Sequence, residues 1–193
     1  MMKNKFKIRF NSPAVLIFAI LCLGALAANL MTFGAANRLL FTTYHSSLLN
    51  PMTWLRFFTH VLGHSGWSHL INNMMYILLL GPMLEEKYGW KRVLQVILLT
   101  GFVTGIINWI FFPGIALCGA SGVCFAFILL SSFTGVKEKE VPLTFILVAV
   151  LYLGQQIYQG LVLDDNVSQL AHILGGIVGS LAGFALAKHK KAY

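Results

Sequence analysis

Five long stretches of this chain contain no lysine, arginine, aspartate or glutamate, and they constrain its fold more than any other feature. They cover residues 10–37, 57–84, 93–136, 141–163 and 166–187. About 20 apolar residues form a helix that spans a bilayer, and most of these stretches reach that length. With 58% hydrophobic and 10% charged residues, the chain has too few charges to cover the surface of a soluble domain. We therefore expect an all-α, polytopic membrane protein.

The longest charge-free stretch must contain two helices, because Pro113 and Gly114 interrupt it. The sequence then predicts six transmembrane helices, at about 13–33, 66–84, 92–112, 117–134, 141–160 and 167–187. No internal repeat or low-complexity linker separates them. We expect residues 1–193 to form one domain, a six-helix bundle.

The first apolar run has a second interpretation. Basic residues precede it, and Ala25-Leu26-Ala27 is similar to the cleavage site of a signal peptide. Because the run continues to Phe33 and is long enough to span a bilayer, we favour an uncleaved first helix. The orientation of the other five helices is the same in both cases.

Basic residues accumulate in cytoplasmic loops and thereby set membrane orientation. If the N-terminus is inside, 12 of the 14 basic residues are cytoplasmic, within 3–9, 87–92, 137–139 and 188–191. The pattern predicts that both termini are cytoplasmic. We attribute the net charge of +8 to this topology and to contact with anionic membrane lipids, and expect no nucleic-acid partner. No soluble domain, transit peptide or retention signal is recognisable, which favours a bacterial plasma (inner) membrane.

The outer segment, residues 34–65, joins the first two predicted helices. It contains Trp54, Phe57 and Phe58 but only two charged residues, Arg38 and Arg56. Connections of this length are uncommon unless they are functional. We predict that the segment folds onto the bundle or dips into the outer leaflet, where protein shields its backbone.

Polar residues within the apolar segments are candidates for function, because burying them in a membrane is costly. His69 and Asn73 lie at the outer end of the second helix, four residues apart and so on one face. His172 lies near the outer end of the sixth helix, on a face rich in glycine. Small residues let a neighbouring helix approach closely, so a partner group can reach His172.

Ser121 lies in the sequence CGASGVC, residues 118–124, at the outer end of the fourth helix. Its depth matches that of His172. A serine hydroxyl becomes a good nucleophile when a histidine takes its proton. The Ser121 N–H at a helix N-terminus and the side chains of His69 and Asn73 could stabilise an oxyanion. Taken alone, each of these residues also fits a purely structural role.

Together these residues resemble the rhomboid family of intramembrane serine proteases. The resemblance covers about residues 56–183. It rests on three motifs in order: His60, His64, His69 and Asn73; then Gly119-Ala120-Ser121-Gly122; then Ala171-His172-Ile173-Leu174-Gly175 with Gly179. It implies that Ser121 is the nucleophile, His172 the general base, and His69 and Asn73 the oxyanion-binding side chains. It also implies cleavage of single-pass transmembrane proteins near the extracytoplasmic face, without a cofactor.

The resemblance also implies supporting roles. Gly119 and Gly122 flank the nucleophile, while Gly175 and Gly179 let the sixth helix close on the fourth. Phe125, where the family often has tyrosine, would stack under the histidine. The remaining similarities imply structural roles, for His60, His64, Arg56 and Glu85.

Three other functions stay open: a catalytically silent rhomboid-like scaffold that binds transmembrane helices, a histidine-based metal or haem protein, and a transporter. No HExxH motif or cysteine pair completes a metal site, and we expect no metal and no cofactor. Cys118 and Cys124 are predicted to be small packing residues. The sequence does not predict an oligomeric state.

Overall fold

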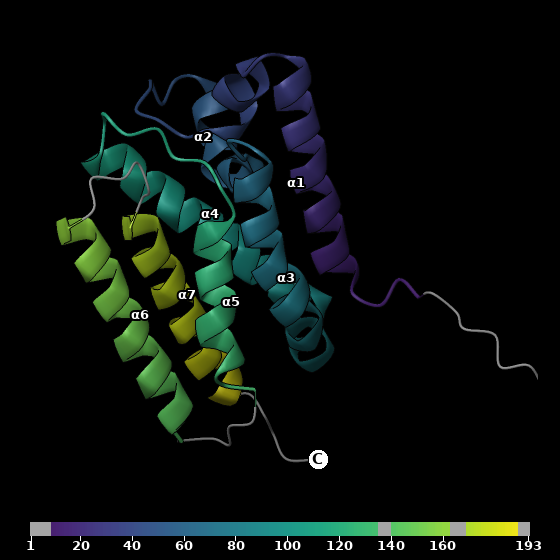
Figure 1. Cartoon of the computed structure of the whole chain (residues 1–193), viewed down its shortest axis with the longest axis vertical. Coiled ribbons are helices and arrows are strands. Elements are labelled where there is room, and N and C mark those ends of the chain that lie inside the picture. The colour runs from purple at the N-terminus through teal and green to yellow at the C-terminus, as the bar shows by residue number, and fades with distance from the viewer. Residues whose placement is uncertain (1–8, 135–139, 163–168, 189–193) are drawn as a thin grey trace, which may run out of the picture.

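The structure is a computed structural model, which describes residues 9–134, 140–162 and 169–188 (Figure 1). The α-helices are α1 Pro13–Met31, α2 Pro51–Thr59, α3 Trp67–Tyr88, α4 Trp90–Phe111, α5 Ser121–Ser131, α6 Leu143–Val162 and α7 Gln169–Lys188. A π-helix, η1 Asn37–Phe41, precedes α2, and a 3-10 helix, η2 His60–Leu62, follows it. The expected all-α fold is confirmed.

The six predicted helices correspond to α1, α3, α4, α5, α6 and α7. The predicted break at Pro113 and Gly114 is confirmed, because α4 ends at Phe111. Within the described ranges, α1 and α4 are each long and apolar enough to cross a membrane. Helix α6 begins and ends two residues later than predicted, and the first two predicted residues of α7 lie outside the described part of the chain. The predicted cytoplasmic basic residues at 3–7, 137–139 and 190–191 also lie outside it.

The first two long helices were predicted to end at Phe33 and Leu84, and both of these C-terminal ends are wrong. Helix α1 ends at Met31, before Phe33 and Gly34, whose φ angles of 51° and 94° are left-handed. Helix α3 continues through Pro82 to Tyr88, four residues beyond the prediction, and ends at Gly89 with φ of 80°.

Glu85 explains why α3 is longer than expected. The prediction stopped at this first charged residue, but its carboxylate is buried. It accepts hydrogen bonds from the backbone N–H groups of Ala14 at 3.1 Å and Val15 at 3.0 Å. A negative charge is favourable at the N-terminus of α1, where these N–H groups have no intrahelical partner. The charge therefore joins α3 to α1.

The predicted span 117–134 is also wrong at both ends, because α5 contains only 11 residues. Leu117 instead pairs with Thr43 of the outer segment, through two backbone hydrogen bonds of 2.9 Å. Gly119 follows with φ of 129°, a conformation that cannot belong to a right-handed helix. At 1.5 Å per residue α5 is about 16 Å long, roughly half the ~30 Å thickness of a bilayer core.

The outer segment folds onto the bundle, as predicted, and it contains the unpredicted helix α2. Asn50 caps this helix by accepting a hydrogen bond from the Met52 N–H at 3.0 Å. Helix α2 packs against α4. Beside it, the ring of His45 stacks on Trp109 with centroids 4.6 Å apart. The indole N–H of Trp109 donates to the carbonyl of Ser46 at 2.9 Å.

Arg56 holds the outer segment together from within. Only 4% of this side chain is exposed. Its Nη1 donates to the Tyr44 hydroxyl at 2.7 Å and its Nη2 to Ser46 Oγ at 3.0 Å. The guanidinium also lies 4.2 Å from the centre of the Tyr44 ring. These contacts agree with the structural role expected for Arg56.

Helix α5 lies in the middle of the bundle, between α3 on one side and α7 on the other (Figure 1). Its closest neighbour is α7, which it contacts along most of its length. Helix α6 lies at the edge and packs mainly against α7. Ser121 is the first residue of α5, the helix that lies between α3 and α7.

Candidate functional site

Helices α5 and α7 approach so closely that only glycine fits at two points. A Cβ atom on Gly175 would lie 2.0 Å from the carbonyl oxygen of Gly122. A Cβ on Gly179 would lie 2.2 Å from the carbonyl oxygen of Ala126. The obstacles are backbone atoms, which cannot rotate aside. The glycines quoted for the resemblance are thus where the two backbones meet.

Ser121 and His172 lie on either side of this contact. A Cβ on Gly122 would lie 3.2 Å from the carbonyl oxygen of Ala171. Ser121 precedes Gly122 in the chain, and His172 follows Ala171. Ser121 is half-buried and His172 is buried. The structure therefore brings together the two segments that carry the predicted nucleophile and base.

Phe125 provides a second link between the two helices. It lies four residues after Ser121 and thus on the same face of α5. Its ring centre lies 4.6 Å from that of His172, at an interplanar angle of 45°. The Phe125 ring also stacks on Tyr152 of α6, with the ring centres 4.1 Å apart. Phe125 therefore packs between His172 of α7 and Tyr152 of α6.

The loop before α5 is shaped around His69 and Asn73. A Cβ on Gly119 would lie 2.7 Å from His69 Nε2 and 3.8 Å from Asn73 Nδ2. The φ of 129° at Gly119 would also strain any other residue. The Gly119 N–H donates to the carbonyl of His60 at 2.9 Å, which anchors this loop to the outer segment. The predicted oxyanion residues therefore adjoin the start of α5.

Hydrogen bonds determine which nitrogen of His69 carries the ring proton. His69 Nδ1 lies 3.5 Å from the backbone N–H of Ser65 and 3.2 Å from Ser65 Oγ. Because a backbone N–H can only donate, Nδ1 accepts and the proton lies on Nε2. This nitrogen is the one nearest Gly119. His69 can thus donate a hydrogen bond toward the start of α5.

The same reasoning orients Asn73. His64 Nδ1 lies 3.0 Å from the carbonyl of Leu62, so it must be the donor, and His64 Nε2 accepts from Asn73 Nδ2 at 3.1 Å. The thiol of Cys124 lies 3.6 Å from Asn73 Oδ1 and 3.4 Å from the Asn73 carbonyl oxygen. One N–H of the Asn73 amide remains for another acceptor.

Two contacts to Asn73 were not predicted. Cys124 was predicted to be a packing residue and His64 to have a structural role. Cys124 lies three residues after Ser121 on the same helix, so its spacing was the available signal. For His64 no local signal existed, because its bond to Asn73 depends on the turn before α3.

His60 and His64 have their ring nitrogens occupied within the protein. His60 Nδ1 lies 3.1 Å from the carbonyl of Arg56, and Nε2 lies 3.1 Å from Thr104 Oγ1. Burial lowers the pKa of His60 and that of His64 to about 4. Across the described ranges no three His, Cys, Asp or Glu side chains gather as possible metal ligands.

The sequence of this chain is similar to that of several known proteins. The sequence model described as "Rhomboid domain" matches residues 51–189. "Rhomboid-like protein 11, chloroplastic" from Arabidopsis thaliana is 29% identical over 158 residues, which cover 74% of this chain and 56% of that protein. "RHOMBOID-like protein 7" from the same plant is 32% identical over 132 residues, 65% of this chain and 41% of that protein.

A bacterial relative is similar over more of its own length. The protein called "Putative rhomboid protease YdcA" from Bacillus subtilis (strain 168) is 29% identical over 159 residues, 78% of this chain and 75% of that protein. By contrast, the chain spans about half the length of the two plant relatives.

Proposed function

Because the chain belongs to the rhomboid family and is a polytopic membrane protein, we propose that it is an intramembrane serine endopeptidase with Ser121 as nucleophile and His172 as general base. The observation that carries this proposal is the contact of α5 with α7 at Gly122 and Ala171. At this contact the backbones of Gly122 and Ala171, the neighbours of Ser121 and His172 in the chain, pack directly against each other. A serine and a histidine must lie within hydrogen-bond reach of each other to act as nucleophile and base, and this contact supports that requirement.

In the first step, His172 takes the hydroxyl proton of Ser121 while the serine oxygen attacks the carbonyl carbon of a peptide bond. The carbonyl oxygen becomes an oxyanion. The C–N bond then breaks, and the amine leaves with the proton that His172 held. The product of this half-reaction is an ester between Ser121 and the new carboxyl end of the substrate.

The oxyanion would accept hydrogen bonds from three donors. They are the Ser121 N–H, the His69 Nε2–H and the free N–H of Asn73. No described side chain caps the N-terminus of α5, so its first N–H groups are available. Removing one such donor in other serine hydrolases slows the reaction about 100- to 1000-fold.

In the second step, His172 takes a proton from water, whose oxygen attacks the ester carbonyl. The C–O bond to Ser121 breaks, and the serine regains its proton from His172. The site must therefore admit water. Because α5 is about half as long as a bilayer is thick, Ser121 would lie below the membrane surface, at the bottom of an aqueous cavity.

We propose six membrane spans, α1 and α3 to α7, with both termini in the cytoplasm and the cavity open to the extracytoplasmic side of the plasma (inner) membrane. The proposal rests on the distribution of basic residues. Substrates would be single-pass proteins whose transmembrane helices unwind near that face. Glycine, serine or proline would help, since they weaken the helix around the scissile bond.

The test is covalent labelling of the detergent-purified protein with a fluorophosphonate probe. Wild-type protein should be labelled, and Ser121→Ala and His172→Ala should not. Ser131→Ala is the matched control, because this serine is on the same helix and its hydroxyl donates to the Ile128 carbonyl at 2.7 Å. A thermal melt of each variant shows that it is folded. Folded wild-type protein that takes up no label would indicate the silent scaffold instead.

A further inference from the structure

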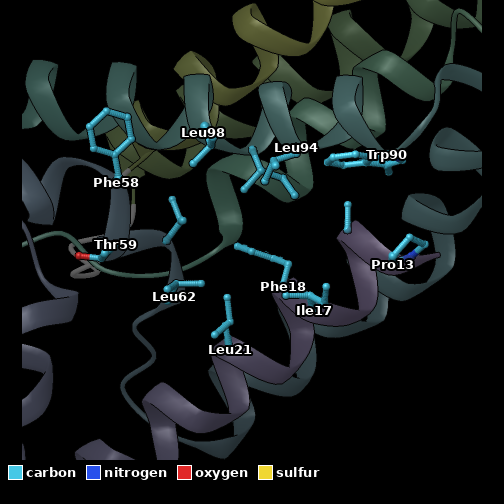
Figure 2. A pocket seen from close by; sticks show the side chains of 13 residues that line it. Pro13, Ile17, Phe18, Leu21, Phe58, Thr59, Leu62, Trp90, Leu94 and Leu98 are labelled. Carbon is cyan, nitrogen blue, oxygen red and sulfur yellow. The ribbon is translucent and has the colours of Figure 1, made fainter. Parts of the chain in front are cut away.

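An apolar groove of about 460 Å³ lies between α1, α4 and the segment of α2 and η2. None of the candidate catalytic residues lines it. Figure 2 shows the groove as elongated, with Trp90 and Pro13 at one end and Phe58, Thr59 and Leu62 at the other. It is separate from the site at Ser121.

The lining contains nothing that would hold a peptide backbone. Its side chains are aliphatic or aromatic, apart from Thr59. The hydroxyl of Thr59 is directed at the carbonyl oxygens of Leu40 and Leu55. Apart from the indole N–H of Trp90 at one end, the lining side chains offer a molecule in the groove no free hydrogen-bonding partner, so most of its buried part must be hydrocarbon.

One end of the groove is positively charged. The ammonium of Lys91 lies 5.6 Å from the ring centre of Trp90, which lines the groove. Lys91 is three residues before Leu94 and so lies on the lining face of α4. Arg9 is four residues before Pro13, which also lines this end. The carboxylate of Glu85 is buried and already bonded to α1.

We propose that this groove binds one acyl chain of an anionic phospholipid, whose phosphate pairs with Lys91. A chain carbon fills about the volume of a water molecule, ~30 Å³, so the groove holds about 15 carbons. That is the length of a common fatty acyl chain. A transmembrane helix is 10–12 Å wide and would not fit beyond roughly one turn. Trp90 next to a lysine is also typical of the boundary between lipid tails and headgroups.

The lipid would support the segment that anchors the active site. Phe58, Thr59 and Leu62 flank His60, whose carbonyl holds the Gly119 N–H at 2.9 Å. Filling the groove would therefore stabilise the loop before Ser121. This consequence, unlike the binding itself, rests on the proposed function.

Native mass spectrometry of delipidated protein tests the binding. Phosphatidylglycerol and phosphatidylcholine with identical chains are added in turn to the Ser121→Ala variant, so the result does not depend on catalysis. We expect one phosphatidylglycerol per chain, bound about fivefold more tightly than phosphatidylcholine. Lys91→Gln should abolish this preference, and Leu94→Trp should weaken the binding of both lipids at least tenfold.

Matched controls lie on another face of α4. Arg92 donates to Gln95 at 2.9 Å, and Leu99 does not line the groove. Arg92→Gln and Leu99→Trp should bind both lipids like the parent. The proposal is overturned if Lys91→Gln keeps the preference, if both lipids bind equally, or if the groove is covered by a second copy of the chain. If Leu94→Trp does not fold, the exposed Lys91→Gln variant decides the matter. Fluorophosphonate labelling fails or succeeds independently of these outcomes.

Discussion

Replacing Gly175 with alanine tests the close approach of α7 to α5. The new Cβ would lie 2.0 Å from the Gly122 carbonyl oxygen, whereas ordinary contacts begin at 3.4 Å. Helix α7 must therefore move by more than 1 Å. Overpacking of this kind destabilises a protein by about 1–3 kcal/mol, which is about 3–10 °C in Tm at this chain length. A displacement of 1 Å near a catalytic group slows the reaction about 100-fold.

Two assays read out the effect: a thermal melt in detergent and the rate of fluorophosphonate labelling at Ser121. The control is Gly24→Ala on α1, because a Cβ there meets nothing within 4 Å. Alanine favours a helix over glycine, so this variant should keep the Tm and the labelling rate of wild type or raise the Tm slightly. If Gly175→Ala behaves like Gly24→Ala in both assays, the reasoning about the helix contact is wrong.

Two further predictions concern buried ionisable groups. Glu85→Gln should lower the free energy of unfolding by about 1–2 kcal/mol in thermal melts, because it removes the charge from the N-terminus of α1, whereas Glu86→Gln should have little effect. His60 and His64 have an ordinary pKa of 6.5 when unfolded and about 4 when folded, so the unfolded chain binds more protons between these values. The Tm should therefore fall as the pH drops from 6.5 to 4, and a flat profile over this range would contradict the assigned burial.

The long helices could be predicted because membrane insertion requires long apolar runs, and the break after α4 because Pro113 and Gly114 together favour a turn. The end of α3 could not. A charge was taken to mark the membrane surface, whereas the Glu85 carboxylate is hydrogen-bonded by the backbone of α1, a partner about 70 residues away. The start of α5 was missed for a similar reason. Leu117 is apolar enough for a helix, but it pairs with Thr43 far along the chain.

Part of the candidate site could likewise be predicted from the sequence, and part could not. The order of the motifs and the glycine spacing on α7 were sufficient to select Ser121 and His172, whose catalytic roles stay predictions. The bonds from His64 and Cys124 to Asn73 depend on three-dimensional packing between α3, α5 and the preceding turn. The spacing of residues along the sequence gives no information about such contacts. Helix α2 was not predicted because its nine residues are too few to span a membrane, and only long apolar runs were assigned as helices.

The bond between Glu85 and the start of α1 also bears on how the protein is made. A ribosome synthesises α1 about 70 residues before the carboxylate that completes its N-terminus. Until α3 has entered the membrane, the N–H groups of Ala14 and Val15 lack this acceptor. The position of α1 therefore becomes fixed only when the third helix of the fold arrives. A nascent chain truncated before residue 85 should hold its first helix loosely, open to chaperones or proteases, and the completed α1–α3 pair should not.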